Sequence, residues 1–289
     1  MKLKIDTEPK IYSLEFSTRG QFYNQSMSPR SIQQKSGAEF DHFRPYQDGD
    51  DARYIDWIAS GRAQQPLVRV YSENISLNVL IMLDVSESMF FGTGDKGKIE
   101  YAIELALNMA FGVLNYGDQV AVIASNDKVV HYTPFISGIE QFETVRQILL
   151  DTKDYGGNFD LKDAINLIVE QYKETHILIM ISDFIGGDIY NDIHSVADRF
   201  DILGILVYDR SEIELTGVPF LNLKDPYTNQ TTHVNVQSIK KRYKQEMMKK
   251  LEGLRIFFTT IEKDIWTIGV GERIEQVIPD LLAKRNNEE

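Results

Sequence analysis

The chain has 289 residues, of which 43% are hydrophobic and 26% are charged, a composition typical of a globular protein with a large core. It contains no cysteine, which excludes disulfides and thiolate metal sites. Lys and Arg number 31 against 43 Asp and Glu, and the net charge of −12 disfavours nonspecific binding to nucleic acid or anionic membranes. Basic protein partners remain compatible with this charge.

The start of the chain and its apolar runs bear on where the protein works. Residues 1–6, Met-Lys-Leu-Lys-Ile-Asp, lack the apolar segment of a secretory signal peptide. No uninterrupted apolar run approaches the roughly 20 residues that a membrane span needs. We therefore expect a cytoplasmic protein without a membrane span.

Residues 1–76 are polar, and their pattern predicts little regular structure. Glycines interrupt the segment at residues 20, 37, 49 and 61, and residues 67–71 (Leu-Val-Arg-Val-Tyr) alternate as a short strand does. We expect residues 1–76 to form an N-terminal extension with irregular and short β elements.

From residue 77 the sequence alternates between apolar runs and helical patterns. The expected strands cover residues 78–84, 119–124, 128–132, 177–182, 202–207 and 255–260. The expected helices cover residues 98–114, 138–150, 159–172, 190–199, 236–252 and a last segment that ends near 284. Hairpins are expected at residues 119–132 and around 227–230. Strands that alternate with helices predict an α/β fold with a doubly wound, mostly parallel sheet over residues 77–286.

The most informative stretch is Asp84-Val85-Ser86-Glu87-Ser88, which directly follows the apolar run 78–83. Such a run is typical of a buried parallel strand, and open α/β sheets bind ligands at the carboxyl ends of their strands. Asp84, Ser86 and Ser88 supply oxygen ligands of low charge, which suit Mg²⁺ or Mn²⁺. Asp183 follows the run 177–182 in the same way, so we expect the two carboxylates to meet.

Two sets of motifs resemble known families. The Asp84 loop, the turn Gly156-Gly157-Asn158 and Asp183 resemble the metal-ion-dependent adhesion site of von Willebrand factor type A domains. Upstream, residues 37–40 (Gly-Ala-Glu-Phe), 44–46 (Arg-Pro-Tyr), 49–53 (Gly-Asp-Asp-Ala-Arg) and 55–57 (Ile-Asp-Trp) look like motifs of the bacterial "domain of unknown function 58" family. Members of that family carry such a domain behind an N-terminal extension. The resemblance covers the chain from about residue 30 to its end.

The resemblance implies a role for each residue of the site. In that site the two serines bind Mg²⁺ directly, which implies that Ser86 and Ser88 are direct ligands. Asp84 and Asp183 would act through waters or through hydrogen bonds to those ligands. A carboxylate from a protein partner would complete the octahedron. The implied metal site comprises Asp84, Ser86, Ser88, Asn158 and Asp183.

One position departs from the family pattern. A threonine is common after the two glycines of the second loop, whereas this chain has Asn158, which offers an amide oxygen. Asp160, two residues further on, is the alternative donor. The departure is expected to weaken metal binding or to change its geometry.

The family context also implies a partner. Its members resemble adaptors of MoxR-type AAA+ ATPases, which remodel or assemble protein complexes. The resemblance thus implies a non-catalytic interaction module that docks a carboxylate through Mg²⁺ and works with such an ATPase or its client. This last step depends on analogy, because a fold does not determine a function.

Two other functions stay open. A metal-dependent hydrolase or phosphotransfer enzyme would use the same Asp84 and Asp183 cluster, although Ser86 stands where an aspartyl-phosphate phosphatase needs a second carboxylate. The second alternative is a structural domain with an empty site. Asp84 or Ser86 would then only cap a helix, and Asn158 would only cap the helix expected from residue 159.

Three further expectations concern residues outside the site. Trp57 is expected to belong to a core. The basic run 240–244, with Lys249 and Lys250, is expected to be a solvated helix face. Ion pairs are expected to seat the extension against the main domain, made by Glu39, Arg44, Asp50, Arg53 and Asp56.

Overall fold

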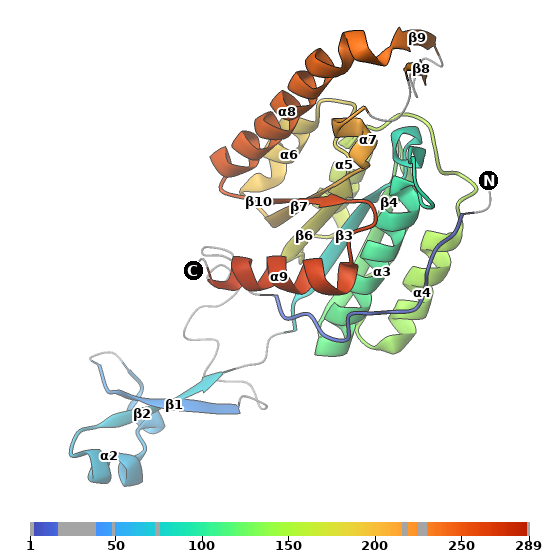
Figure 1. The fold of residues 1–289 in the computed structure, drawn as a ribbon. Helices are drawn as coiled ribbons and strands as arrows, with labels where there is room; N and C mark the ends of the chain where they lie inside the picture. The colour runs from blue at the N-terminus through green and yellow to red at the C-terminus, as the bar shows by residue number, and fades with distance from the viewer. Residues whose placement is uncertain are drawn as a thin grey trace. The chain divides into compact units, whose positions relative to one another are not determined.

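We describe the protein from a computed structural model, which covers residues 3–16, 39–47, 50–72, 76–215, 219–224 and 230–287. The chain divides into two compact units (Figure 1). The α/β unit comprises Met1–Arg19 and Leu77–Glu289, and the N-terminal unit comprises Gly20–Ser76.

The α/β unit is built on a six-stranded sheet with the strand order β10-β7-β6-β3-β4-β5. The strands are β3 (Asn78–Asp84), β4 (Gln119–Ser125), β5 (Val129–Tyr132), β6 (Ile177–Ser182), β7 (Asp201–Tyr208) and β10 (Asp264–Gly269). Neighbouring strands are parallel except for β4 and β5, which form the expected antiparallel hairpin. The predicted α/β fold with a mostly parallel sheet is confirmed.

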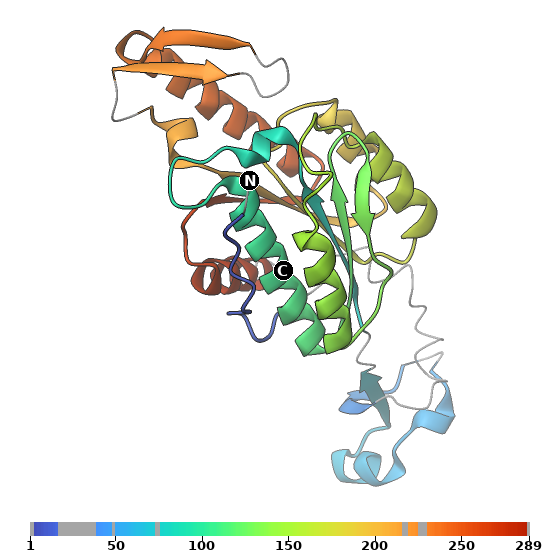
Figure 2. The ribbon, with the colours of Figure 1, turned by 90° about the vertical axis from the view of Figure 1, so that its right-hand side faces the viewer.

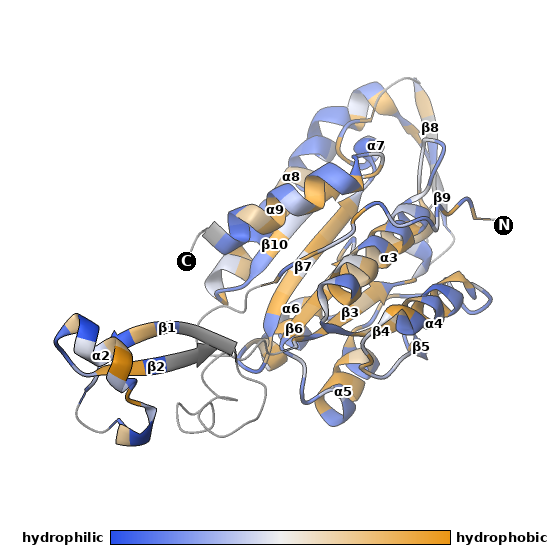
Figure 3. Cartoon of the chain, turned by 90° about the horizontal axis from the view of Figure 1, so that it is seen from below, coloured by the Kyte–Doolittle hydropathy of each residue, from blue (hydrophilic) through white to orange (hydrophobic). Residues whose placement is uncertain are grey.

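Helices cover both faces of the sheet (Figures 1 and 2). One face packs against α3 (Lys98–Tyr116), α4 (Ile139–Leu150) and α9 (Ile274–Asn287), and the other against α5 (Lys162–Gln171), α6 (Ile189–Ala197) and α8 (Val236–Thr260). In β3, Ile81 packs toward the first layer, whereas its neighbours Leu80 and Met82 pack toward the second. Burial on both faces explains the unbroken apolar runs, and Figure 3 shows hydrophobic colour concentrated in the central strands.

Shorter elements lie around this sheet. The 3-10 helix η2 (Glu87–Phe90) follows β3, and the short helix α7 (Arg210–Ile213) follows β7. β8 (Phe220–Lys224) and β9 (Thr231–Asn235) pair in an antiparallel hairpin that leads into α8. Residues 227–229 of its expected turn lie outside the described residues. None of the helices in the described ranges combines the length and apolar composition needed to cross a bilayer.

The strand predicted at residues 255–260 is wrong. These residues belong to α8, where Leu254 and Phe258 are buried on one face of the helix and pack into the core. The strand lies a few residues later, in β10, where the buried Trp266 and Ile268 flank the exposed Thr267. A short apolar run such as Ile256-Phe257-Phe258 fits a helix as well as a strand, so its pattern alone misleads.

Residues 3–16 form an extended segment that lies along α3 (Figure 2). Side-chain oxygens four residues apart on one face of α3 accept hydrogen bonds from backbone N–H groups of this segment. These pairs are Glu100 with Lys4 (2.5 Å), Glu104 with Asp6 (2.6 Å) and Asn108 with Lys10 (2.7 Å). Ile11, Leu14 and Phe16 are buried in the core. The segment therefore belongs to the α/β unit, whereas the prediction placed it in the N-terminal extension.

The N-terminal unit contains β1 (Glu39–Pro45) paired antiparallel with β2 (Leu67–Ser72), the 3-10 helix η1 (Ala52–Tyr54) and α2 (Trp57–Ala63). Asp56 caps α2 by accepting from the N–H groups of Ile58 and Ala59, and it pairs with Arg69 at 2.6 Å. α2 buries Ser60, while Trp57 is 72% exposed. The predicted core position of Trp57 is wrong in this unit.

Ion pairs of the N-terminal unit form within it. Arg44 binds both carboxylate oxygens of Asp50, at 2.6 and 2.7 Å, and Arg53 pairs with Asp51 at 2.5 Å. Both pairs brace loops of the N-terminal unit itself, whereas the prediction used Arg44, Asp50 and Arg53 to seat the extension against the main domain. The side chain of Glu39 lies outside the described part of the structure.

Candidate functional site

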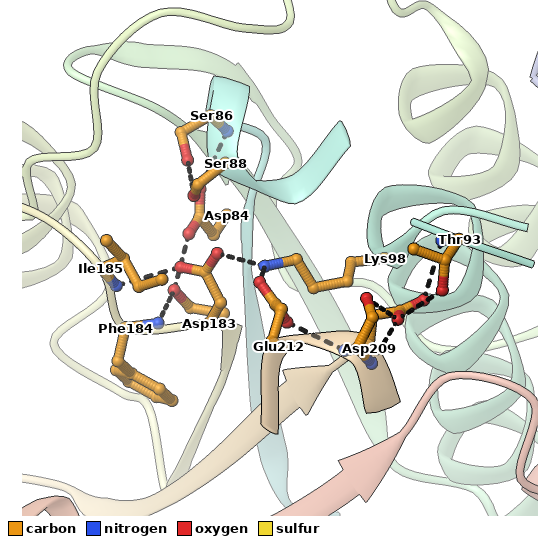
Figure 4. Close-up of polar contacts among 12 residues, drawn as sticks. Asp84, Ser86, Ser88, Thr93, Lys98, Asp183, Phe184, Ile185, Asp209 and Glu212 are labelled. Carbon is orange, nitrogen blue, oxygen red and sulfur yellow. Dashed lines mark hydrogen bonds and ion pairs between the residues drawn. The ribbon is translucent and has the colours of Figure 1, made fainter. Parts of the chain in front are cut away.

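The candidate site lies where two central strands end. β3 and β6 are parallel neighbours, so Asp84 at the end of β3 and Asp183 just after β6 reach the same edge of the sheet. They are 0% and 3% exposed. Figure 4 shows the two carboxylates close together, as expected from the sequence. Ser182 Oγ donates a hydrogen bond of 2.6 Å to Asp84 Oδ2, and the N–H of Ser86 donates one of 2.9 Å to Asp84 Oδ1.

Two buried hydroxyls lie beside Asp84. Ser86 and Ser88 are 0% and 5% exposed, and their Oγ atoms lie 3.2 Å apart (Figure 4). Ser86 precedes η2 as its N-cap residue, but its hydroxyl makes no capping hydrogen bond. Helix capping therefore does not account for the Ser86 side chain, although Asp84 does satisfy one backbone N–H group in the loop.

The second predicted loop packs against the first. The N–H of Gly156 donates to the carbonyl of Val85 at 2.8 Å, and the N–H of Glu87 donates to the carbonyl of Gly157 at 2.9 Å. Gly156 and Gly157 have φ angles of 106° and 77°, in the region that favours glycine. Asn126 Nδ2 holds the Gly156 carbonyl at 2.7 Å. The two glycines thus bring this loop to the site.

The two residues considered as the third donor are placed differently. The side chain of Asn158 is exposed, and Asp160 Oδ1 accepts a hydrogen bond of 2.8 Å from the N–H of Lys162. The helix expected from residue 159 begins at Lys162, so Asn158 does not cap it. The structure brings Asp84, Ser86, Ser88 and Asp183 together, and Asn158 is exposed on the neighbouring loop.

Sequence reasoning missed a buried ion-pair network next to Asp183. Lys98 Nζ lies 2.7 Å from Asp183 Oδ2 and 2.6 Å from Glu212 Oε1 (Figure 4). Glu212 belongs to α7, and its second oxygen accepts from the N–H of Asp209 at 2.9 Å. Asp209 in turn accepts from the hydroxyl of Thr93 at 2.8 Å. The available signal was a lysine at the start of a helix, where the helix dipole disfavours a cation.

Burial controls the electrostatics of the site. Burial, with a further contribution from the charge of Asp183, raises the pKa of Asp84 to about 7. Burial alone would lower the pKa of Lys98, but Asp183 and Glu212 outweigh it and raise that pKa above its ordinary value. The Lys98 ammonium is therefore charged and offsets part of the negative charge of the cluster.

The donor set determines which cation fits here. No group of three or more His, Cys, Asp or Glu residues in the described ranges is placed to hold a metal ion. The hydroxyls of Ser86 and Ser88 would have to supply ligands, with Asp84 beside them and Asp183 held by Lys98. Oxygen donors of this kind fit a hard cation that keeps open positions, such as Mg²⁺ or Mn²⁺.

The fold and the site together define an α/β protein with a loop cluster of hydroxyls and carboxylates at the carboxyl edge of a parallel sheet. The chain belongs to the family described as protein of unknown function DUF58, whose model matches residues 42–252. The predicted family is confirmed. The uncharacterised proteins Rv1480 of Mycobacterium tuberculosis and Mb1516 of Mycobacterium bovis are each 27% identical to this chain over 192 residues. The match covers 65% of this chain and 61% of each relative.

Solved structures with a similar fold include BatB from Bacteroides thetaiotaomicron, at 13% identity and a TM-score of 0.46, covering 73% of this chain and 100% of that one. The SpRpn10 VWA domain is similar at 9% identity and a TM-score of 0.40, covering 72% of this chain and 95% of that one.

Proposed function

We propose that this chain is a protein-interaction module that binds a carboxylate of a protein partner through Mg²⁺ held at the Asp84 loop. The observation that carries the proposal is the buried pair of hydroxyls on Ser86 and Ser88, 3.2 Å apart and next to the Asp84 carboxylate. Bound Mg²⁺, or Mn²⁺ in its place, would supply an electrophilic position for an anionic ligand, because neutral hydroxyls leave most of its charge uncompensated.

Each residue has a distinct part in this proposal. Ser86 and Ser88 would bind the metal directly, and Asn158 would offer an amide oxygen from the neighbouring loop. Asp84 and Asp183 would hold those groups and their waters in place. The charge of Asp84 favours cation binding once the carboxylate is deprotonated.

The proposed partner is a MoxR-type AAA+ ATPase or one of its clients. Support for this step is the resemblance of the family to adaptors of such ATPases. The proposal describes recognition and not turnover, because both oxygens of Asp84 already accept hydrogen bonds and Ser86 occupies the position of a second carboxylate.

The test is a pull-down from native cytosol with the purified chain, in Mg²⁺ and in chelator. Asp84→Ala removes one of the two carboxylates of the site. Ser195→Ala is the matched control, because it removes an exposed hydroxyl that donates to the Asp192 carbonyl within α6. The proposal expects an AAA+ ATPase or a distinct client to be retained only with metal and only by the wild type and the control. Retention that ignores both metal and Asp84 contradicts it, and Mg²⁺-dependent hydrolysis of a phosphate ester lost in Asp84→Ala would favour an enzyme.

A further inference from the structure

Lys98, the first residue of α3, is a lysine with no exposed surface. Its ammonium pairs with Asp183 at 2.7 Å and with Glu212 at 2.6 Å, and it lies 5.9 Å from the centre of the Phe91 ring. A cation at a helix N-terminus faces the positive end of the helix dipole, and burial of charges costs solvation energy. Apolar side chains often replace buried ion pairs without loss of stability, so packing alone does not explain this lysine.

Asp183 is the group that Lys98 restrains. Lys98 donates to Asp183 Oδ2, and the N–H of Ile185 donates to Asp183 Oδ1 at 3.0 Å. Lys250 of α8 donates to the backbone carbonyl of the same residue at 3.2 Å. Every oxygen atom of Asp183 therefore accepts a hydrogen bond, so the orientation of the carboxylate is fixed from both sides.

We propose that Lys98 is a positioning residue of the candidate metal site, which holds Asp183 so that this carboxylate does not bind the cation directly. This inference depends on the proposed function. With Asp183 restrained, the cation is bound mainly by the neutral hydroxyls of Ser86 and Ser88. It keeps both an open position and most of its charge for the carboxylate of a partner.

Removal of Lys98 has opposite effects on the two binding steps. A freed Asp183 carboxylate becomes a direct ligand, which raises metal affinity because ligand charge strengthens binding of a hard cation. The same bond occupies a coordination position and neutralises charge, which weakens binding of an external carboxylate. A lysine that served only to stabilise the fold would, on removal, weaken both steps together.

The experiment titrates Mn²⁺ into the purified chain and follows water proton relaxation, which reports the water molecules on the bound ion, with acetate as the carboxylate probe. Lys98→Met is compared with Lys96→Met. Lys96 lies two residues before Lys98, is part-exposed and pairs with Glu104. A second variant adds Glu212→Gln to Lys98→Met, because Glu212 left unpaired and largely buried would destabilise the fold.

The inference expects both Lys98 variants to bind Mn²⁺ more tightly, by roughly tenfold, with fewer bound waters and without the acetate response of the wild type. Lys96→Met should match the wild type. If the folded Lys98 variants bind Mn²⁺ no more tightly than the wild type, with an unchanged number of bound waters, the inference about Lys98 is overturned. The proposed function is not affected by that result. Absence of Mn²⁺ binding by the wild type overturns the proposed function together with this inference.

Discussion

Ser182 Oγ donates a hydrogen bond of 2.6 Å to Asp84 Oδ2, and this bond joins the ends of two neighbouring parallel strands. The same Ser182 oxygen accepts from the N–H of Phe184 at 2.8 Å. Phe184 has a φ of 51°, which is uncommon for a residue other than glycine. One hydroxyl therefore fixes both the Asp84 carboxylate and the turn that carries Asp183.

Ser182→Ala is expected to destabilise the protein. It leaves Asp84 Oδ2 without this donor in a buried position, which costs about 1–3 kcal/mol of the free energy of unfolding. Urea unfolding measures the loss, and Ser195→Ala, which changes an exposed serine, should stay within about 0.5 kcal/mol of the wild type. Equal stability of the two variants would show that the Ser182 bond does not support the site.

The stability of the metal-free protein is expected to fall as the pH rises from about 4 to 7. The pKa of Asp84 is about 7 in the folded protein against 3.8 in the unfolded chain, so in this window the folded state holds a proton that the unfolded state has lost. The loss is at most about 4 kcal/mol, since one pKa unit corresponds to about 1.4 kcal/mol. Urea unfolding in chelator across this range should show the slope in the wild type and a weaker one in Asp84→Asn. Equal slopes in both proteins would contradict the assignment to Asp84.

Gly156→Ala is expected to disturb the second loop. The φ of 106° is strained for alanine, and the added Cβ would lie 2.9 Å from Glu87 Oε2. We expect a loss of about 1–3 kcal/mol in the free energy of unfolding, together with weaker Mg²⁺ binding measured by calorimetry. Gly94→Ala is the control, because its Cβ would meet nothing within 4 Å. A Gly156→Ala protein as stable as the control would rule out this loop geometry.

Gly112→Ala is expected to loosen the segment 3–16. Alanine normally stabilises a helix relative to glycine by about 1 kcal/mol, but here its Cβ would lie 2.7 Å from Leu14 Cγ. Hydrogen exchange of the Leu14 N–H, which bonds the Gly112 carbonyl at 3.0 Å, should become faster. Gly253→Ala in α8, where the nearest atom is 3.9 Å away, should instead stabilise the protein. Unchanged exchange at Leu14 would mean that the segment does not depend on this contact.

Apolar periodicity predicted five of the six strands of the sheet and most helices correctly, because the central strands are buried on both faces. The same signal failed at residues 255–260, where Leu254 and Phe258 continue one face of a long helix. It also did not predict the segment 3–16. That segment has no helix or strand periodicity, since its backbone N–H groups donate to side chains of α3. Long-range contacts of this kind leave little local pattern.

The candidate site was predictable in part. The strand ends placed Asp84, Ser86, Ser88 and Asp183 together, because the carboxyl ends of parallel strands share one edge of the sheet. Lys98 and Glu212 were not predictable as partners, since 114 residues separate them and only the fold brings them into contact. The exposure of Trp57 likewise depends on which side of α2 packs, which a short helix does not reveal.

Calorimetric titration of Mg²⁺ into the purified chain tests the central claim most directly. The wild type is compared with a variant in which Ser86 and Ser88 are both changed to alanine, and with Ser195→Ala as the control. The account predicts saturable binding by the wild type and the control, and its loss in the double variant, which lacks both hydroxyl ligands. Absence of binding by the wild type, or undiminished binding by the double variant, would contradict it.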